Sequence, residues 1–399
     1  MAHLLWGKVY LQNHFAGILQ QEPGGGTSFT YDPTYLDASL PPIAHTLPLR
    51  TAPYITQHGL HPFFENLIAE GWLEQIQART LGQHIIDRFA LLLAFGMDCA
   101  GGIAIVDPEP AQRSDRHLDP KEIPILTSQF SLSGVQPKLA VIARDGKFYP
   151  AKTGELSTHI AKFASQDHPD LLHNEYLSTQ ALKALLPQEQ VVELILGTVE
   201  GISEEALMIK RFDRTPTGRI HFEEFNQLLN YPSAKKYDGS HKEMADFIRT
   251  TPGCLPAENL RLLGRILAGL LLGNTDMHFK NFAMLHTTAG LRLSPIYDTV
   301  AAALYDYKTV ALAITGTHNF RLGDLTARNI IGLTKEFALP MGALQILIRQ
   351  LKKNKLLAQQ VIHDTKVGSP ALKQNLTELL EKRWNGTFTL IGKILSKKL

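Results

Sequence analysis

The sequence predicts an α+β fold with a small mixed unit first, a β-rich lobe next and a mainly helical lobe last. Apolar and polar residues alternate with a period of two near the start of the chain and again from residue 131, a pattern typical of strands. Beyond residue 222, apolar residues recur at helical spacing instead. We therefore divide the chain into residues 1–108, 109–222 and 223–399.

The first part combines strands and helices. Residues 9–20 alternate around Asn13 and predict a hairpin, and residues 27–31 follow three glycines as another short strand. Residues 107–121 are rich in proline and charge, and we interpret them as a connector. Two groups of apolar residues between these segments fall at helical spacing: Phe63, Phe64, Leu67 and Ile68, then Ile85, Phe89, Leu92 and Leu93.

The two lobes differ in their predicted elements. Asp145-Gly146 predicts a tight hairpin in the β-rich lobe. Short segments bounded by turn residues predict strands at 139–143, 147–150, 159–163, 191–199 and 206–212. Amphipathic or apolar periodicity predicts helices over 174–186, 257–272 and 341–360.

Composition excludes several classes of protein. The 399 residues include 40 Lys and Arg against 38 Asp and Glu, and a net charge of +2 does not indicate a nucleic-acid coat protein. Two cysteines, Cys99 and Cys254, are too few for a disulfide framework or a cysteine-based zinc site. The longest apolar run, 266–272, is too short to span a membrane, and no secretory signal is visible. We expect a cytoplasmic protein with no membrane partner.

The most informative segment is the polar loop that follows Gly273. Asp276 and Asn281 are five positions apart, the D-x-x-x-x-N spacing of a phosphotransfer loop, in which the Asp deprotonates an acceptor hydroxyl and the Asn holds a metal ion. Asp298 follows seventeen residues later, after a predicted hairpin, as a second metal ligand. Together these three residues predict a Mg²⁺-nucleotide site.

A simpler interpretation is that Asp276 and Asn281 only cap local turns, as polar loop residues often do. The order of helix, loop, strand, turn and Asp favours the metal site. We group His278 with Asp276 as a candidate catalytic residue, and expect its ring to steady the loop rather than to bind a metal.

A nucleotide site also needs a cation for the phosphates. Lys162 lies on a predicted strand, and Glu175 follows thirteen residues later near the start of a predicted helix, which offers a strand-lysine and helix-glutamate pair. A strand lysine taken alone is more often a surface residue. Ser133 and Gly134, just before a strand, could cover phosphates with backbone N–H groups. The segment is not a P-loop.

These motifs, in this order, resemble those of the HipA family of bacterial toxin–antitoxin serine/threonine kinases over nearly the whole chain. The resemblance rests on Phe63–Leu67, Glu70–Trp72, Asp98–Gly101, Ser133–Lys138, Asn174–Tyr176, Lys210–Arg214, Gly273–Asn281 and Leu293–Asp298. It implies a protein-kinase-like two-lobed fold, with Asp276 catalytic, Asn281 and Asp298 as metal ligands, and Lys162 on the ATP phosphates. The strand from Lys210 to Phe212 resembles the hinge that meets adenine.

The resemblance also implies regulation and partners. A serine of the glycine loop, Ser131 or Ser133, would be autophosphorylated and eject the loop from the ATP site. Family substrates include aminoacyl-tRNA synthetases. The usual partner is a small DNA-binding antitoxin, and we expect DNA contact only through it.

The leading hypothesis is thus an ATP- and Mg²⁺-dependent protein serine/threonine kinase. The main alternative is a kinase-like binding module that acts as a repressor subunit or as an exported, host-directed effector. A phosphohydrolase that uses Asp276 and His278 is a third interpretation, which the lack of a paired-carboxylate cage disfavours.

Overall fold

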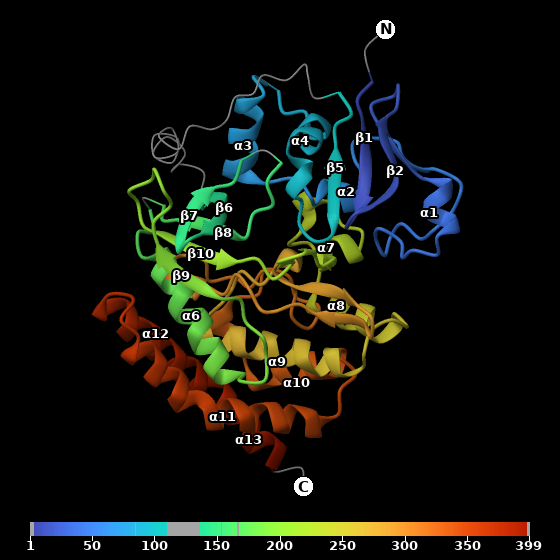
Figure 1. The fold of residues 1–399 in the computed structure, drawn as a ribbon. Coiled ribbons are helices and arrows are strands. Elements are labelled where there is room, and N and C mark those ends of the chain that lie inside the picture. Colours follow the sequence, from blue (N-terminus) through green and yellow to red (C-terminus); the bar gives the residue numbers. More distant parts are fainter. Residues whose placement is uncertain (1–3, 84, 110–135, 153, 166, 397–399) are drawn as a thin grey trace. The chain divides into compact units, whose positions relative to one another are not determined.

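The computed structural model describes residues 4–83, 85–109, 136–152, 154–165 and 167–396, and contains both helices and strands (Figure 1). Two compact units divide the chain. Unit 1 comprises Met1–Pro169 and Glu193–Ser233, and unit 2 comprises Asp170–Val192 and Ala234–Leu399. The mixed content confirms the predicted α+β class, while the division into three domains stays a prediction. Most of the predicted connector lies outside the described residues.

Unit 1 begins with a five-stranded antiparallel sheet in the order β4-β3-β2-β1-β5. Its strands are β1 (Trp6–Leu11), β2 (His14–Gln21), β3 (Thr27–Tyr31), β4 (Tyr54–Thr56) and β5 (Ile103–Val106). The predicted hairpin is confirmed, and the chain reverses at Gln12, whose φ of 55° is left-handed. The strand predicted over residues 27–31 is also confirmed.

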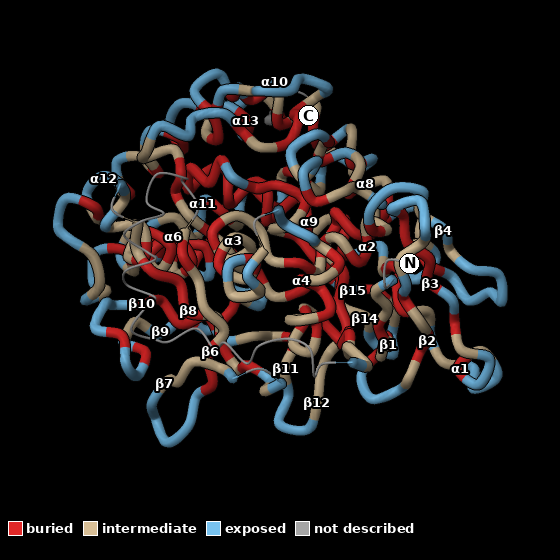
Figure 2. Tube along the Cα trace, turned by 90° about the horizontal axis from the view of Figure 1, so that it is seen from above, coloured by how far each residue is buried: buried red, intermediate tan, exposed pale blue. Residues whose placement is uncertain are grey.

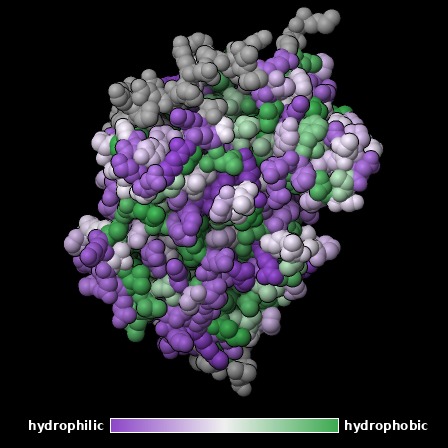
Figure 3. Space-filling model, in the orientation of Figure 1, coloured by the Kyte–Doolittle hydropathy of each residue, from purple (hydrophilic) through white to green (hydrophobic). Residues whose placement is uncertain are grey.

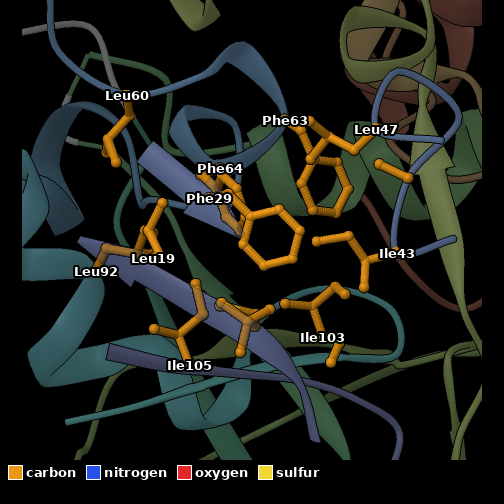
Figure 4. Close-up of a cluster of buried hydrophobic side chains, with 14 of the residues drawn as sticks. Leu19, Phe29, Ile43, Leu47, Leu60, Phe63, Phe64, Leu92, Ile103 and Ile105 are labelled. Atoms are coloured by element: carbon orange, nitrogen blue, oxygen red, sulfur yellow. The ribbon is translucent and has the colours of Figure 1, made fainter. Parts of the chain in front are cut away.

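Short helices supply apolar residues to the core of this sheet. They are α1 (Pro33–Asp37), α2 (Pro62–Glu65), α3 (Gly71–Thr80) and α4 (Arg88–Phe95). Phe29, Phe63 and Phe64 are almost fully buried in this core, where the Phe29 and Phe64 rings lie 5.4 Å apart (Figure 4). Burial of such rings is a main source of folding free energy for the sheet.

Three residues predicted to be helical lie outside the helices. Leu67 and Ile68 follow α2, which ends at Glu65, and Ile85 precedes α4. Helix α4 begins only after Asp87, whose side chain accepts a hydrogen bond from the Ala90 N–H. This N-cap fixes the start of the helix, so Ile85 precedes it and is 87% exposed. Phe89, Leu92 and Leu93 are buried on the helix as predicted.

A second five-stranded antiparallel sheet in unit 1 has the order β7-β6-β8-β10-β9. Its strands are β6 (Lys138–Arg144), β7 (Lys147–Pro150), β8 (His159–Phe163), β9 (Leu194–Gly197) and β10 (Ala206–Lys210). The predicted Asp145-Gly146 turn has φ values of 50° and 76°, as a tight hairpin requires. One face of the sheet packs against Trp72 and Ile76 of α3.

A buried network of ion pairs joins the end of β10 to the segment before β5. Arg211 donates to Asp98 at 3.1 Å and to Asp213 at 2.8 Å, and Arg214 donates to the same two carboxylates at 2.8 and 2.7 Å. Burial alone would raise the pKa of Asp213, but the Arg211 charge and hydrogen bonds hold it below its usual value. Two motifs that are far apart in the sequence therefore form one structural unit. The short elements β11 (Arg214–Thr215), β12 (Gly218–Arg219), β13 (Phe222–Glu224) and α7 (Phe225–Leu228) follow.

Unit 2 is mainly helical and contains one hairpin. Its helices are α6 (Leu171–Leu185), α8 (His241–Thr250), α9 (Ala257–Leu272), α10 (Ala327–Glu336), α11 (Met341–Asp364), α12 (Pro370–Arg383) and α13 (Thr389–Ser396). The paired strands are β14 (Ala283–Thr287) and β15 (Gly290–Leu293). Helix α9 packs against α6, α11 and α12, and residues 262–272 are buried throughout (Figure 2).

One face of the molecule has a mixed surface. Hydrophobic residues are scattered among hydrophilic ones on the face displayed in Figure 3. Among the described residues, no helix combines the length and the apolar character needed to cross a membrane. Cys99 and Cys254 are both buried free thiols.

The ion network of unit 1 predicts that two adjacent cations, Arg211 and Lys210, contribute very differently to the free energy of unfolding. Arg211→Met removes one partner of a buried set whose side chains are 5–18% exposed, and should cost about 3–5 kcal/mol of unfolding free energy. Lys210 pairs with Glu193 at 2.9 Å, but these side chains are 52% and 68% exposed. Lys210→Met should therefore cost less than ~1 kcal/mol. Urea unfolding measures both, and equal losses would contradict the assignment.

Candidate active site

The polar loop of unit 2 starts from a fixed point because α9 ends in a left-handed turn. Gly273 has a φ of 81°, and the Asn274 N–H donates back to the Gly269 carbonyl at 2.9 Å. Only glycine adopts this conformation without strain. The predicted end of the helix at Gly273 is thus confirmed, and the chain turns sharply into the loop.

Two buried side chains anchor the loop just after an exposed carboxylate. Met277 packs so tightly on α9 that a Cβ on Gly269 would lie 2.3 Å from its sulfur. Phe279 is fully buried. Asp276 is exposed, although Thr275 and Met277 beside it are buried. The backbone under Asp276 is therefore held by the core while its carboxylate stays open to a ligand.

Hydrogen bonds within the loop bring Asp276, His278 and Asn281 together. Asn281 Nδ2 donates to the Asp276 carbonyl at 2.7 Å, and the Asn274 side chain accepts from the Asp276 N–H at 3.1 Å. His278 Nδ1 accepts from the Lys280 N–H at 3.2 Å, so this nitrogen supports the loop. The turn-capping interpretation is correct for the Asn281 Nδ2 group, but metal binding would use its other atom, Oδ1.

The segment that delivers Asp298 is fixed on its upstream side by α9. Glu258 accepts from the Leu293 N–H at 2.9 Å, and Arg265 donates to the Ser294 carbonyl at 2.8 Å. The Tyr297 hydroxyl donates to the Lys280 carbonyl at 2.8 Å. This last bond ties the neighbour of Asp298 to the neighbour of Asn281, so the two predicted metal ligands belong to one connected structure.

The downstream side of Asp298 is fixed by the first turns of α6. Asn174 is fully buried, and its side chain accepts from the Ala301 N–H at 3.0 Å and donates to the Ala301 carbonyl at 3.3 Å. The Tyr305 hydroxyl donates to Asp170 at 2.9 Å. Asp298 itself has a left-handed φ of 55°, a strained conformation that such surrounding contacts maintain.

Buried charges hold α9 against Glu189, in the segment that follows α6. Glu189 accepts from Arg261 at 2.8 Å and from Arg265 at 2.7 Å. Burial would raise the pKa of Glu189, but the two guanidinium groups lower it below its usual value. Sequence reasoning missed this cluster, although charged residues inside an apolar helix were the available signal.

The nucleotide-binding candidates of unit 1 are placed differently from one another. Lys162 lies on β8 and is buried, with 9% exposure, opposite Lys138 on one side and Leu207 on the other. Its neighbours Ala161 and Phe163 point into the apolar cluster on the other face. Lys162 thus differs from a typical exposed surface lysine.

The remaining candidates are distributed over both units. Lys210 is exposed and paired with Glu193, and the Phe212 ring packs 4.9 Å from that of Phe222. Glu175 is 1% exposed on α6 in unit 2, whereas Lys162 belongs to unit 1. Their pairing stays a prediction. Ser131, Ser133 and Gly134 lie outside the described residues.

Comparison with protein families defines the class of protein. The HipA-like C-terminal domain model matches residues 130–360, and the HipA N-terminal domain model matches residues 7–106. The chain therefore belongs to the HipA family.

Individual relatives agree with this classification. "Putative kinase Y4mE" of Sinorhizobium fredii is 27% identical over 80% of this chain and 82% of its own length. "Serine/threonine-protein kinase toxin HipA" of Shewanella oneidensis is 28% identical over 76% of each chain. Among solved structures, the HipA of a Shewanella oneidensis complex with HipB and operator DNA matches with a TM-score of 0.78. That match has 23% identity and covers 97% of this chain and 99% of the other, which confirms the predicted kinase-like two-lobed fold.

Proposed function

We propose that this protein is an ATP- and Mg²⁺-dependent protein serine/threonine kinase. The observation that carries the proposal is the exposed Asp276 carboxylate on a loop with buried anchors, bonded through its backbone to Asn281. Catalysis of phosphoryl transfer consists mostly of positioning and charge stabilisation. A rigid loop with one exposed carboxylate meets the requirement for positioning.

Each residue has a distinct role in this proposal. Asp276 accepts the proton of the acceptor hydroxyl as its oxygen attacks phosphorus. Asn281 and Asp298 offer oxygen donors, the ligand type that Mg²⁺ prefers. When bound, Mg²⁺ supplies positive charge that stabilises the transferring phosphoryl group. Lys162 neutralises phosphate charge, and Glu175 orients that lysine.

The adenine contact in this proposal comes from the strand end at Lys210–Phe212. The Lys210 side chain pairs with Glu193, so the backbone of this segment is the part that binds adenine. Ser133 and Gly134 cover the phosphates. These roles follow the HipA family pattern residue by residue.

The biological role in this proposal is that of a toxin in a toxin–antitoxin pair. A relative of 28% identity is named a serine/threonine-protein kinase toxin, and the structural neighbour is a complex with HipB and operator DNA. We propose a small DNA-binding antitoxin as partner, with DNA contact through it, since the net charge of this chain is only +2. The proposed substrate is a translation component such as an aminoacyl-tRNA synthetase.

The first prediction separates a kinase from a kinase-like binding module. Asp276→Asn keeps the shape of the side chain but removes the base, so phosphoryl transfer should fall at least ~100-fold while ATP affinity stays within about twofold. Transfer of ³²P from γ-labelled ATP and calorimetric ATP binding measure the two effects. Transfer by the variant at the wild-type rate would show that Asp276 is not the base. Absence of transfer by the wild type to itself and to candidate synthetases would favour the binding module.

A second prediction concerns the phosphate and metal ligands. Lys162→Ala should weaken ATP binding about tenfold or more, because a buried charge on the phosphates is lost. Asp298→Ala should raise the Mg²⁺ concentration needed for half-maximal ATP binding. Lys210→Ala is the matched control, and should change ATP affinity by less than about twofold because only its backbone is used. Equal, negligible changes in ATP affinity for the Lys162 and Lys210 variants would show that Lys162 does not bind the phosphates.

A third prediction concerns self-inactivation through Ser131 and Ser133. A phosphate on either serine adds about −1.5 to −2 charge at pH 7 and should repel ATP. Mass spectrometry should find phosphate on this pair in the wild type and none in Asp276→Asn. The double Ser→Ala variant should keep its activity over time, and the double Ser→Asp variant should bind ATP more weakly. An unphosphorylated active enzyme would exclude this regulation.

A further inference from the structure

An exposed tyrosine contacts the proposed catalytic base. The Tyr237 hydroxyl donates to Asp276 Oδ1 at 3.1 Å, although the two residues are 39 positions apart. Both belong to unit 2. The roles assigned above to the loop residues do not account for this contact.

The backbone that carries Tyr237 is held against the loop. The Phe279 N–H donates to the Lys236 carbonyl at 3.3 Å, and the Ala313 N–H donates to the Gly239 carbonyl at 3.0 Å. A Cβ on Gly239 would lie 2.2 Å from the Phe279 ring, so this close approach requires glycine. Immediately afterwards, Ser240 caps α8 in a capping box with Glu243. The segment is therefore fixed at both ends.

The side chain of Tyr237 is supported as well. Its ring meets the His278 ring edge-on, with centroids 5.0 Å apart and an interplanar angle of 84°. His278 is only 6% exposed, and its Nδ1 accepts the Lys280 N–H. A buried imidazole locked to the backbone thus forms a rigid surface under the phenol. This gives His278 a second role, which is to support the residue that contacts the base.

The contact has a direct consequence for the carboxylate. The carboxyl group of an exposed aspartate rotates readily about its Cβ–Cγ bond. Asp276 is exposed. A hydrogen bond from a fixed donor to Oδ1 sets the direction in which the second oxygen points. Bonds to charged acceptors are stronger than neutral ones. Tyr237 is 44% exposed, so its ring contributes little to the core, and core packing does not explain its position.

We propose that Tyr237 is a positioning residue that orients the Asp276 carboxylate toward the acceptor hydroxyl. The inference rests on the proposed kinase function and extends it to a residue that the sequence motifs do not include. Tyr237 acts only through Asp276, and no proton passes through its hydroxyl. The nucleotide side of the site does not depend on it.

The test is Tyr237→Phe, which keeps the ring on His278 and removes only the hydroxyl. We expect kcat for transfer to a protein acceptor to fall about tenfold, with KM for ATP and the melting temperature unchanged. Tyr10→Phe, which removes a phenol from the N-terminal sheet, is the matched control and should behave as wild type. In an Asp276→Ala background, Tyr237→Phe should have no further effect, because the partner is already gone.

Each other outcome overturns the inference. Unchanged or increased kcat in Tyr237→Phe would show that the contact is dispensable or inhibitory. Additive losses in the double variant would show an effect that does not pass through Asp276. Phosphate on Tyr237 in the wild type would make it an acceptor rather than a positioning residue. Complete lack of transfer by the wild type would instead refute the proposed function itself, and this inference with it.

Discussion

The left-handed turn at Gly273 is the constraint on which the candidate site depends. It ends α9 at a fixed place, and the loop then returns its two apolar side chains, Met277 and Phe279, to the core. Both approach glycines, Gly269 and Gly239, so closely that no Cβ fits. The turn at Gly273 fixes the backbone before Asp276 and the two anchors fix it after Asp276, so the polar side chains of the loop project at defined positions. The exposed Asp276 is a result of this packing.

Buried ion pairs are the second feature that fixes the backbone around the candidate site. Glu189 and Arg265 hold α9 in unit 2, and Asp213 and Arg211 hold the end of β10 in unit 1. Such pairs add little net stability over apolar residues of equal volume, because desolvation opposes the attraction. Their directional bonds do fix backbone atoms, however: Arg265 holds the Ser294 carbonyl that leads to Asp298. Both clusters therefore position segments to which we propose a role in the active site.

Periodicity in the sequence predicted elements whose faces are clearly divided, such as the hairpin of β1 and β2 and helix α9, which spans the predicted residues 257–272. It failed at Leu67 and Ile68, which follow the end of α2, and at Ile85, because an N-cap two residues later outweighs apolar spacing. Local spacing also placed Asp276 and Asn281 in one loop. It could not reveal Tyr237 or Glu189, since their partners are 39 and 72 or more positions away and depend on the tertiary fold.

The most direct test of the central claim is a crystal structure with a non-hydrolysable ATP analogue and Mg²⁺. We expect the metal on Asn281 Oδ1 and the Asp298 carboxylate at about 2.1 Å, the phosphates near Lys162, and Asp276 on the acceptor side without a metal bond. Nucleotide bound elsewhere, or a metal held by Asp276 in place of Asp298, would contradict it.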